Sequence, residues 1–361
     1  MEYRKFGDSQ LEVSVVGFGG WPMGGTQYGE VDDSEGQRAV EHAIDIGVTC
    51  FDNAAGYGMG HSERVMGAAL KPYRDKVVIV TKGGIEWHEE EKRMGRNGSR
   101  DFIIKGAEQS LKNLGTDYID LLLIHWPDME TPFEETMRAL EDLQQSGKIR
   151  YAGVSNFMPE MMEECRKHIK IVTNQVGYSM FERRPERAIM EYCANNGMGI
   201  MSYGSLAHGL LAGNMTLDTQ FETWDWRSSG HAFGMPFFDR EKHFAHNVAA
   251  QDKLRGIAER EGHTLPDLAL AWVLNHKVVS TALVGFRTTK EVDDAAQASE
   301  WKLSGQLLSE VTQISDEAFR RMEADEGVFE RGGWNSYDPN PPKFAGGGKS
   351  SPDETFDADS Y

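Results

Sequence analysis

Short apolar or β-branched runs alternate along the chain with longer segments whose apolar residues recur at helical spacing. Eight runs predict strands, at residues 15–17, 48–52, 77–81, 119–124, 151–154, 172–176, 199–202 and 281–284. Amphipathic segments predict helices at 33–46, 62–70, 101–114, 133–145, 159–167 and 185–195 and, after a long insertion at 214–242, at 244–261, 266–275, 289–298 and 304–322. Asp33 or Ser34 is expected to cap the first helix, and Gly115 and Gly147 are expected to stop the third and fourth. Strands that alternate with helices in this way indicate βα units and a parallel sheet.

Two further apolar segments, at 3–6 and 11–13, flank a polar turn and predict a hairpin that closes one end of the sheet. The pattern therefore predicts an α/β fold: a (β/α)8 TIM barrel with an N-terminal β-hairpin and additional C-terminal helices. A doubly wound sheet with a second domain is the alternative on rhythm alone. We expect residues 1–330 to form the barrel, and the Gly-, Pro-, Ser- and Asp-rich segment 331–361 to be a tail, flexible or draped on it.

Charge and cysteine content narrow the function classes. The chain carries 38 Lys and Arg against 57 Asp and Glu, a net charge of −19 that disfavours nucleic-acid binding. No apolar run approaches the length of a membrane span, and the first residues lack the apolar core of a secretion signal. Cys50, Cys165 and Cys193 are expected as free thiols. Free thiols and the missing secretion signal together predict a cytoplasmic location. A homo-oligomer is left open. His243 and His246 lack a third ligand nearby, so no metal site is predicted.

Four residues that can transfer or stabilise a proton follow predicted strands. Asp52 and Tyr57 follow the second strand, Lys82 the third and His125 the fourth. In a barrel, the carboxyl ends of the strands meet at one rim, so these side chains would converge. Each alone has an ordinary structural reading. Together they suit protonation of a carbonyl oxygen, with Tyr57 as the acid, Lys82 lowering its pKa, Asp52 holding Lys82 and His125 orienting the carbonyl.

The order of motifs resembles the aldo-keto reductases, which are NAD(P)H-dependent barrel enzymes. DNAAGYG with HSE, VTKGG, DLLLIHWPD, VSNF, NQVGYS and a GFRTT segment occur in sequence, and the resemblance covers residues 3–322. It implies that Asp52, Tyr57, Lys82 and His125 are the catalytic residues. It favours the barrel over the doubly wound sheet. A cofactor-binding regulatory subunit, like the channel-associated members of that family, is the alternative function, and a barrel hydrolase would leave Lys82 unexplained.

The resemblance also implies a cofactor site, with NADP(H) favoured and NAD(H) or dual use as the alternative. Ser155, Asn156 and Gln175 would bind the nicotinamide carboxamide, and Tyr203 would stack on its ring. Small residues with free backbone N–H groups would lie along the pyrophosphate. Arg287 and Thr288 would receive a 2′-phosphate, which the acidic Glu291 disfavours. The full set of implied cofactor residues is Gly20, Trp21, Asp52, Ser155, Asn156, Gln175, Tyr203, Gly204, Ser205, Leu206, Gly209, Gly285, Arg287, Thr288 and Glu291. Ser205 and Asn214 replace a Pro and a Lys that similar members carry, which removes an expected cationic contact.

The substrate pocket is expected to take a small aldehyde, ketone or sugar. Trp21, Trp87 and Trp126 follow strands one, three and four, so their rings would wall the site above Tyr57. The predicted substrate residues are therefore Trp21, Tyr57, Trp87, His125 and Trp126. The insertion at 214–242, which is rich in aromatic residues, is a candidate lid. Packing of these aromatic residues at the barrel rim is the alternative. Arg183 and Arg184 would brace the cofactor side or lie in water.

Overall fold

The computed structural model describes residues 1–25, 29, 32–88 and 93–324. Eight parallel strands close into a barrel in the order β10-β11-β12-β3-β4-β5-β8-β9. Their bounds are Val16–Gly19 (β3), Cys50–Asp52 (β4), Val78–Gly83 (β5), Ile119–Ile124 (β8), Ile149–Ser155 (β9), Ile171–Gly177 (β10), Gly199–Tyr203 (β11) and Val279–Gly285 (β12). The predicted (β/α)8 barrel is therefore confirmed, and the doubly wound alternative is wrong.

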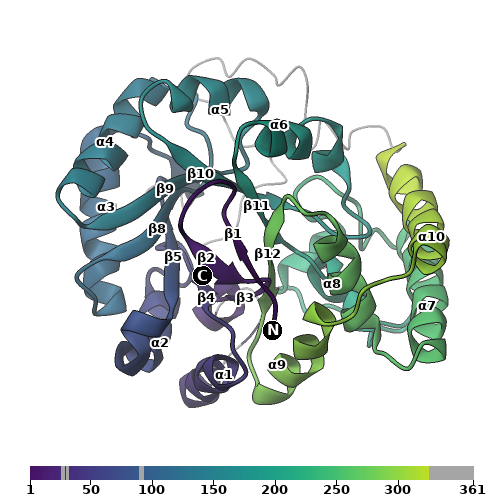
Figure 1. Cartoon of the computed structure of the whole chain (residues 1–361). Helices are drawn as coiled ribbons and strands as arrows, with labels where there is room; N and C mark the ends of the chain where they lie inside the picture. The colour runs from purple at the N-terminus through teal and green to yellow at the C-terminus, as the bar shows by residue number, and fades with distance from the viewer. Residues whose placement is uncertain (26–28, 30–31, 89–92, 325–361) are drawn as a thin grey trace.

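Helices surround the barrel (Figure 1). They are α1 (Asp33–Asp45), α2 (His61–Leu70), α3 (Arg100–Leu114), α4 (Phe133–Gln145), α5 (Pro159–Arg166), α6 (Ile189–Asn195), α7 (Phe244–Arg260), α8 (Leu265–Asn275), α9 (Thr289–Ala296) and α10 (Gly305–Glu323). Gly115 and Gly147 end α3 and α4 as predicted, with φ of 64° and 75°. No neighbouring atom would meet a Cβ at either position, so the left-handed backbone explains these glycines.

The predicted N-terminal hairpin closes the amino-terminal end of the barrel. β1 (Tyr3–Lys5) and β2 (Glu12–Ser14) pair antiparallel, and Figure 1 shows them at the centre of the ring of strands. Phe6, Leu11 and Val13 are buried in one cluster with side chains from inside the barrel, namely Cys50, Val80, Leu121, Leu123, Val172, Met201 and Leu283. Arg4 donates hydrogen bonds of 2.8 and 2.9 Å to the carbonyls of Val279 and Leu274. The hairpin is thus fastened to the last strand of the barrel and the helix before it.

The structure corrects several predicted elements. A second antiparallel pair, β6 (Ile85–His88) with β7 (Arg93–Arg96), was not predicted, because its strands are short. The helix predicted at 185–195 is broken into a 3-10 turn, η3 (Arg184–Arg187), and α6. Asp32, not Asp33 or Ser34, caps α1 by accepting from the amides of Ser34 and Glu35. The tail predicted at 331–361 lies outside the described residues, so the domain division stays a prediction.

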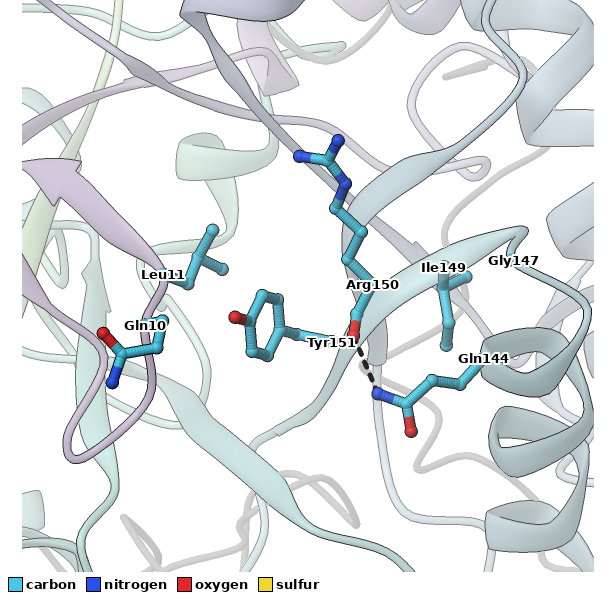
Figure 2. A pocket seen from close by; sticks show the side chains of 7 residues that line it. All are labelled: Gln10, Leu11, Gln144, Gly147, Ile149, Arg150 and Tyr151. Carbon is cyan, nitrogen blue, oxygen red and sulfur yellow. Dashed lines mark hydrogen bonds between the residues drawn. The ribbon is translucent and has the colours of Figure 1, made fainter.

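A hollow of about 560 Å³ lies at the amino-terminal end of the barrel (Figure 2). It is lined by Gln10 and Leu11 of the hairpin and by Gln144, Gly147, Ile149, Arg150 and Tyr151 of the connection from α4 into β9. At one side of the hollow, Gln144 Nε2 donates a hydrogen bond of 2.7 Å to the carbonyl of Arg150. The residues predicted to carry chemistry lie at the opposite end of the strands, so this hollow is separate from them.

Three properties of the described residues concern membrane spans, metal sites and cysteine reactivity. Within the described residues, no helix is both long and apolar enough to cross a bilayer. Over the same residues, no three His, Cys, Asp or Glu side chains gather in a way that could hold a metal ion. The three cysteines are free and buried, and burial raises the pKa of Cys165 and Cys193 to about 12, which keeps them as thiols.

A pair of helical glycines tests the close packing of α2 on α3. A Cβ on Gly67 would lie 2.5 Å from the Leu114 carbonyl oxygen, whereas one on Gly106 would meet nothing within 4 Å. We expect Gly67→Ala to destabilise the protein by about 1–3 kcal/mol through overpacking. Gly106→Ala, the matched control, should stabilise it by about 0.5–1 kcal/mol through helix propensity. Unfolding midpoints in urea measure both, and equal midpoints would contradict the close contact.

Candidate active site

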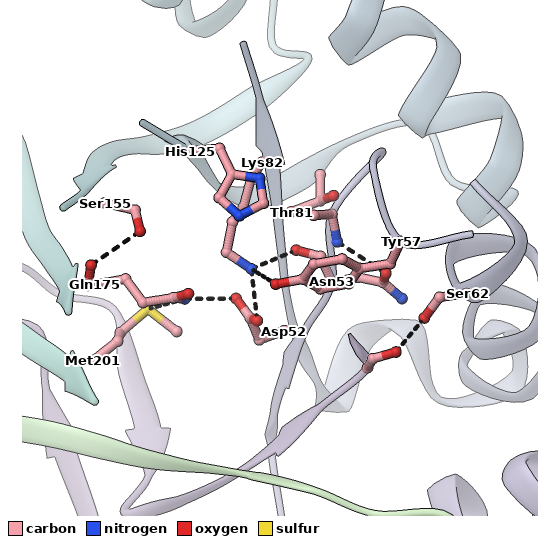
Figure 3. A network of polar contacts seen from close by, with 12 residues as sticks. Asp52, Asn53, Tyr57, Ser62, Thr81, Lys82, His125, Ser155, Gln175 and Met201 are labelled. Carbon is pink, nitrogen blue, oxygen red and sulfur yellow. Dashed lines mark hydrogen bonds and ion pairs between the residues drawn. The ribbon is translucent and has the colours of Figure 1, made fainter. Parts of the chain in front are cut away.

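The carboxyl ends of β4, β5 and β8 bring the four predicted catalytic side chains together (Figure 3). Asp52 is the last residue of β4, Lys82 lies in β5, and His125 follows β8. The backbone amide of His125 donates 2.9 Å to the Gly83 carbonyl, which continues the pairing of β8 with β5 to this point. Tyr57 comes from the loop between β4 and α2, and its ring centroid lies 5.9 Å from that of His125.

The Lys82 ammonium makes three hydrogen bonds from a buried position. Nζ donates to Asp52 Oδ2 at 2.7 Å, to the Asn53 carbonyl at 2.8 Å and to the Tyr57 hydroxyl at 3.1 Å. An ammonium has three donors and no acceptor, so these contacts account for all of its hydrogens. Since the Tyr57 oxygen accepts from Lys82, the Tyr57 hydrogen can point at another group. Gln175 Nε2 donates 2.7 Å to the other Asp52 oxygen, so the carboxylate is held at both ends.

Burial dominates the acid–base properties of this group. It raises the pKa of Asp52 and lowers the pKa of Lys82, while each charge opposes the shift of the other. Burial raises the pKa of Tyr57 well above 10.0, and the Asp52 charge adds to the rise. The prediction that Lys82 lowers the Tyr57 pKa is therefore wrong for this structure, because burial penalises the phenolate and the Asp52 charge penalises it further. Tyr57 stays a protonated phenol at neutral pH, which is the form that can donate a proton.

His125 is held as a neutral imidazole. Burial lowers its pKa well below 6.5, and the nearby Lys82 charge acts in the same direction. Its Nδ1 atom is buried with no hydrogen-bond partner among the described residues. A buried polar atom without a partner is costly, so this ring is suited to bind a ligand that supplies one.

The residues predicted to bind nicotinamide lie beside the catalytic group at the ends of β9, β10 and β11. Ser155 Oγ donates 2.9 Å to the Gln175 carbonyl, and Asn156 Nδ2 donates 3.0 Å to Ser155 Oγ. The Tyr203 hydroxyl donates 3.0 Å to Asn156 Oδ1, and its ring lies over Gly177, where a Cβ would come within 3.3 Å of it. Asn156 has a φ of 63°, in the left-handed region that asparagine adopts more readily than most residues. Amide groups beside an aromatic face fit a nicotinamide carboxamide and ring.

The segment predicted to follow the pyrophosphate has an unusual backbone. Gly204, Ala207, His208 and Gly209 all have positive φ, between 47° and 99°. The expectation of unbonded amides is wrong for Gly209, whose N–H donates 3.1 Å to the Leu206 carbonyl. Ser205 is turned inward, where its hydroxyl donates to the Ser202 carbonyl at 3.1 Å. The role of this segment along the pyrophosphate stays a prediction.

At the adenosine end, Glu291 interacts with the residues predicted to bind a phosphate. Its carboxylate accepts from the Arg287 amide at 2.7 Å and the Thr288 amide at 3.3 Å, and lies 3.2 Å from the Arg287 guanidinium. The carboxylate thus already occupies the N-terminus of α9, where a phosphate would bind. Gly285 is the last residue of β12 and lies against Pro22. A Cβ on Gly285 would come within 2.6 Å of the proline ring, so this contact leaves no room for a side chain. Gly20 precedes the 3-10 turn η1 (Trp21–Gly24), and its carbonyl accepts from Ser62 Oγ at 2.6 Å.

Aromatic rings wall the space above Tyr57. Trp21 stacks on Tyr57 at 6.2 Å between centroids and on Trp226 of the insertion at 5.5 Å. Trp126 stacks on Phe233, also from the insertion, at 6.1 Å. The insertion therefore does pack over this rim. Trp87 lies half-buried in β6, whose hairpin adjoins the Tyr57 loop at Gly56, and its predicted substrate role stays a prediction.

Comparisons with known proteins identify the family. A family model described as "Aldo/keto reductase family" matches residues 15–316. This chain belongs to the aldo/keto reductase family. Aldo-keto reductase YhdN of Bacillus subtilis is 36% identical over 87% of this chain and 93% of its own length. L-glyceraldehyde 3-phosphate reductase of Escherichia coli is 31% identical over 82% and 87%. The solved structure of a glycerol dehydrogenase from Gluconobacter oxydans has a TM-score of 0.78 and 34% identity over 90% and 96%.

Membership makes this aldo/keto reductase an NAD(P)H-dependent reductase of carbonyl compounds. Its relatives differ in cofactor. An aldo-keto reductase of Schizosaccharomyces pombe, 31% identical over 87% of this chain and 92% of its own, is named for NADP(+). A methylglyoxal reductase of Escherichia coli, 30% identical over 84% and 95%, is named as NADH-specific. Family membership alone therefore leaves the choice between the two cofactors to local residues.

Two features of the site were not predicted from the sequence. The contact of Gln175 with Asp52 joins the cofactor set to the catalytic set, and the two residues are 123 positions apart. Arg184, left between two interpretations, is buried in an ion pair with Glu182, with Nε 2.8 Å from Oε1. The only sequence signal for this buried ion pair is the run Glu182-Arg183-Arg184, and such charged runs usually lie in solvent.

The two pKa directions predict a flat pH profile for this aldo/keto reductase. His125 stays neutral and Tyr57 stays protonated through the neutral range, because their pKa values lie well below 6.5 and well above 10.0. We expect kcat/KM for carbonyl reduction to be constant between about pH 6 and pH 8 and to fall only in strong base, as the acid Tyr57 loses its proton. An inflection near 6.5 that disappears in His125→Asn would contradict this assignment.

Proposed function

We propose that this aldo/keto reductase reduces a small aldehyde, ketone or sugar, with Tyr57 as the proton donor. When bound, NAD(P)H supplies the hydride that reaches the carbonyl carbon. Tyr57 gives its hydroxyl proton to the carbonyl oxygen, so the C=O becomes a CH–OH and Tyr57 becomes a phenolate. The observation that carries the proposal is the 3.1 Å hydrogen bond from Lys82 Nζ to the Tyr57 oxygen.

The surrounding residues support each part of this proton transfer. Lys82 holds an ammonium beside the oxygen that becomes negative, and Asp52 keeps that ammonium in place at 2.7 Å. His125 is neutral, so one ring nitrogen carries a hydrogen that can bond and orient the carbonyl oxygen. The named substrates of two relatives, L-glyceraldehyde 3-phosphate and glycerol, are three-carbon compounds and support a small substrate. The same groups work in the direction of alcohol oxidation.

NADP(H) is the cofactor we propose, bound through the set predicted above. Ser155, Asn156 and Gln175 would hold the carboxamide, and Arg287 and Thr288 the 2′-phosphate. Glu291 weakens this last contact, because its carboxylate pairs with Arg287 and lies at the same amides. The preference for NADP(H) over NAD(H) rests on the match of Arg287 and Thr288 to phosphate-binding positions, and the Glu291 carboxylate opposes it.

We also propose that residues 1–330 act as one catalytic domain in the cytoplasm, with 331–361 as a tail of no catalytic role. The three free, buried cysteines support this location.

Substitution of Tyr57 by Phe tests the chemistry. The hydroxyl is lost but the ring and its contact with Trp21 are kept. We expect kcat to fall by about 10²–10⁴-fold, the usual contribution of a general acid, with the Kd for NADPH unchanged. Steady-state kinetics with propanal and Trp quenching by NADPH give the two quantities. Tyr151→Phe, which removes a tyrosine hydroxyl at the opposite end of the barrel, serves as the control, and unchanged turnover in Tyr57→Phe would remove Tyr57 from the reaction.

Substitution of Glu291 by Gln tests the cofactor assignment. Removing the negative charge near the 2′-phosphate should tighten NADPH binding by about fivefold to tenfold and leave NADH binding unchanged, since two like charges about 4 Å apart repel by about 1–4 kcal/mol. Parallel fluorescence titrations with the two nucleotides measure the ratio. Arg287→Met should shift it the other way. Equal changes for both nucleotides would place the phosphate elsewhere.

A further inference from the structure

One turn of the insertion has a backbone that its residues do not favour. Ala232 and Met235 exchange two backbone hydrogen bonds of 2.8 and 2.9 Å, so Phe233 and Gly234 form the two central positions of a tight turn. Their φ values are 49° and 83°, the pattern of a type I′ turn. Glycine adopts this conformation freely, whereas a bulky aromatic residue is strained in it. Something in the surroundings must hold Phe233 in place.

A buried ion pair from the loop after β10 holds this turn. Arg184 Nη2 donates 3.0 Å to the Phe233 carbonyl. Arg184 and Glu182 are 3% and 5% exposed, and Nε of Arg184 donates to both Glu182 oxygens at 2.8 and 3.0 Å. Burial of a charged pair needs full hydrogen bonding to offset the lost hydration. The Phe233 carbonyl supplies one of these bonds, so the pair and the turn stabilise each other.

The strained backbone places the Phe233 ring among the walls of the active site. The ring is half-buried and lies 6.1 Å from Trp126, nearly parallel to it, and 6.1 Å from Trp21. It meets the Tyr203 ring edge-on at 5.3 Å. Trp21 in turn stacks on Tyr57. Phe233 therefore contacts three walls of the space above the proton donor, although it comes from an insertion about 30 residues beyond β11.

We propose that Phe233 determines substrate size for this reductase: its ring, held by the Arg184–Glu182 pair, closes the space above Tyr57 to bulky aromatic carbonyl compounds and admits small aliphatic ones. Backbone strain that persists at a ligand site is explained when the strained side chain has a task there. This inference rests on the proposed function, because it assumes that the carbonyl group lies against Tyr57.

Substitution of Phe233 by Gly removes the ring and suits the turn, since glycine favours positive φ. We expect the ratio of kcat/KM for 2-naphthaldehyde to that for propanal to rise at least about tenfold, the scale of discrimination by a filled apolar pocket. Phe233→Asn, which also tolerates this backbone, and Phe233→Leu should give a graded series, in which the ratio increases as the side chain shrinks. A purely structural role would move both substrates together and give no such order.

The matched control is Phe221→Ala, which removes a ring from the same insertion that packs on Phe238 at 5.2 Å, away from Tyr57. Its ratio should equal that of the unsubstituted protein. A ratio unchanged across the Phe233 series, or changed equally by Phe221→Ala, would overturn the proposal. Failure of the proposed function has a different signature: propanal reduction by the unsubstituted protein would then be absent or insensitive to Tyr57→Phe.

Discussion

The ion pair between Asp52 and Lys82 is the contact on which the site of this reductase depends. Both side chains are almost fully buried, and two charges removed from water are tolerated only where every donor and acceptor is bonded. The Asn53 carbonyl, the Tyr57 hydroxyl and the Gln175 amide meet that requirement. The bonding that makes the pair stable therefore also sets the position of the proton donor. Stability and chemistry share the same few hydrogen bonds here.

Backbone strain is concentrated at the same end of the barrel. Among the described residues, five that are not glycine have positive φ: Met59, Asn156, Ala207, His208 and Phe233. All five lie in segments that follow the carboxyl end of a barrel strand. In a regular strand or helix, the repeat of the backbone fixes the direction of each side chain. Loops at the rim can point side chains in other directions, and here they do so with residues at positive φ. The barrel supplies a rigid base that tolerates this strain.

The sequence was sufficient to predict the barrel and to bring four catalytic candidates to one rim. Strand ends carry that information, because Asp52, Lys82 and His125 directly follow apolar runs whose partners are set by the parallel order of strands. The hairpin of β6 and β7 escaped prediction, because four-residue strands have too little alternation to stand out. The predicted direction of the Tyr57 pKa shift was wrong, since that shift depends mainly on how deeply the folded rim buries the hydroxyl. Arg184 and Phe233 meet only through the folded insertion, and no local pattern marks such a contact.

The hairpin at the amino-terminal end has a consequence for how this chain folds. Arg4 binds the carbonyls of Leu274 and Val279, and the Lys5 carbonyl accepts from Ser280, at separations of 270 to 275 residues. The residues that close the floor of the barrel are made before the strand that fastens them. Contacts of such long range form late, because the loop they close is large. During synthesis, Phe6 and Leu11 can therefore meet side chains of the earlier strands first, and their packing is completed by Leu283 only when β12 joins β3.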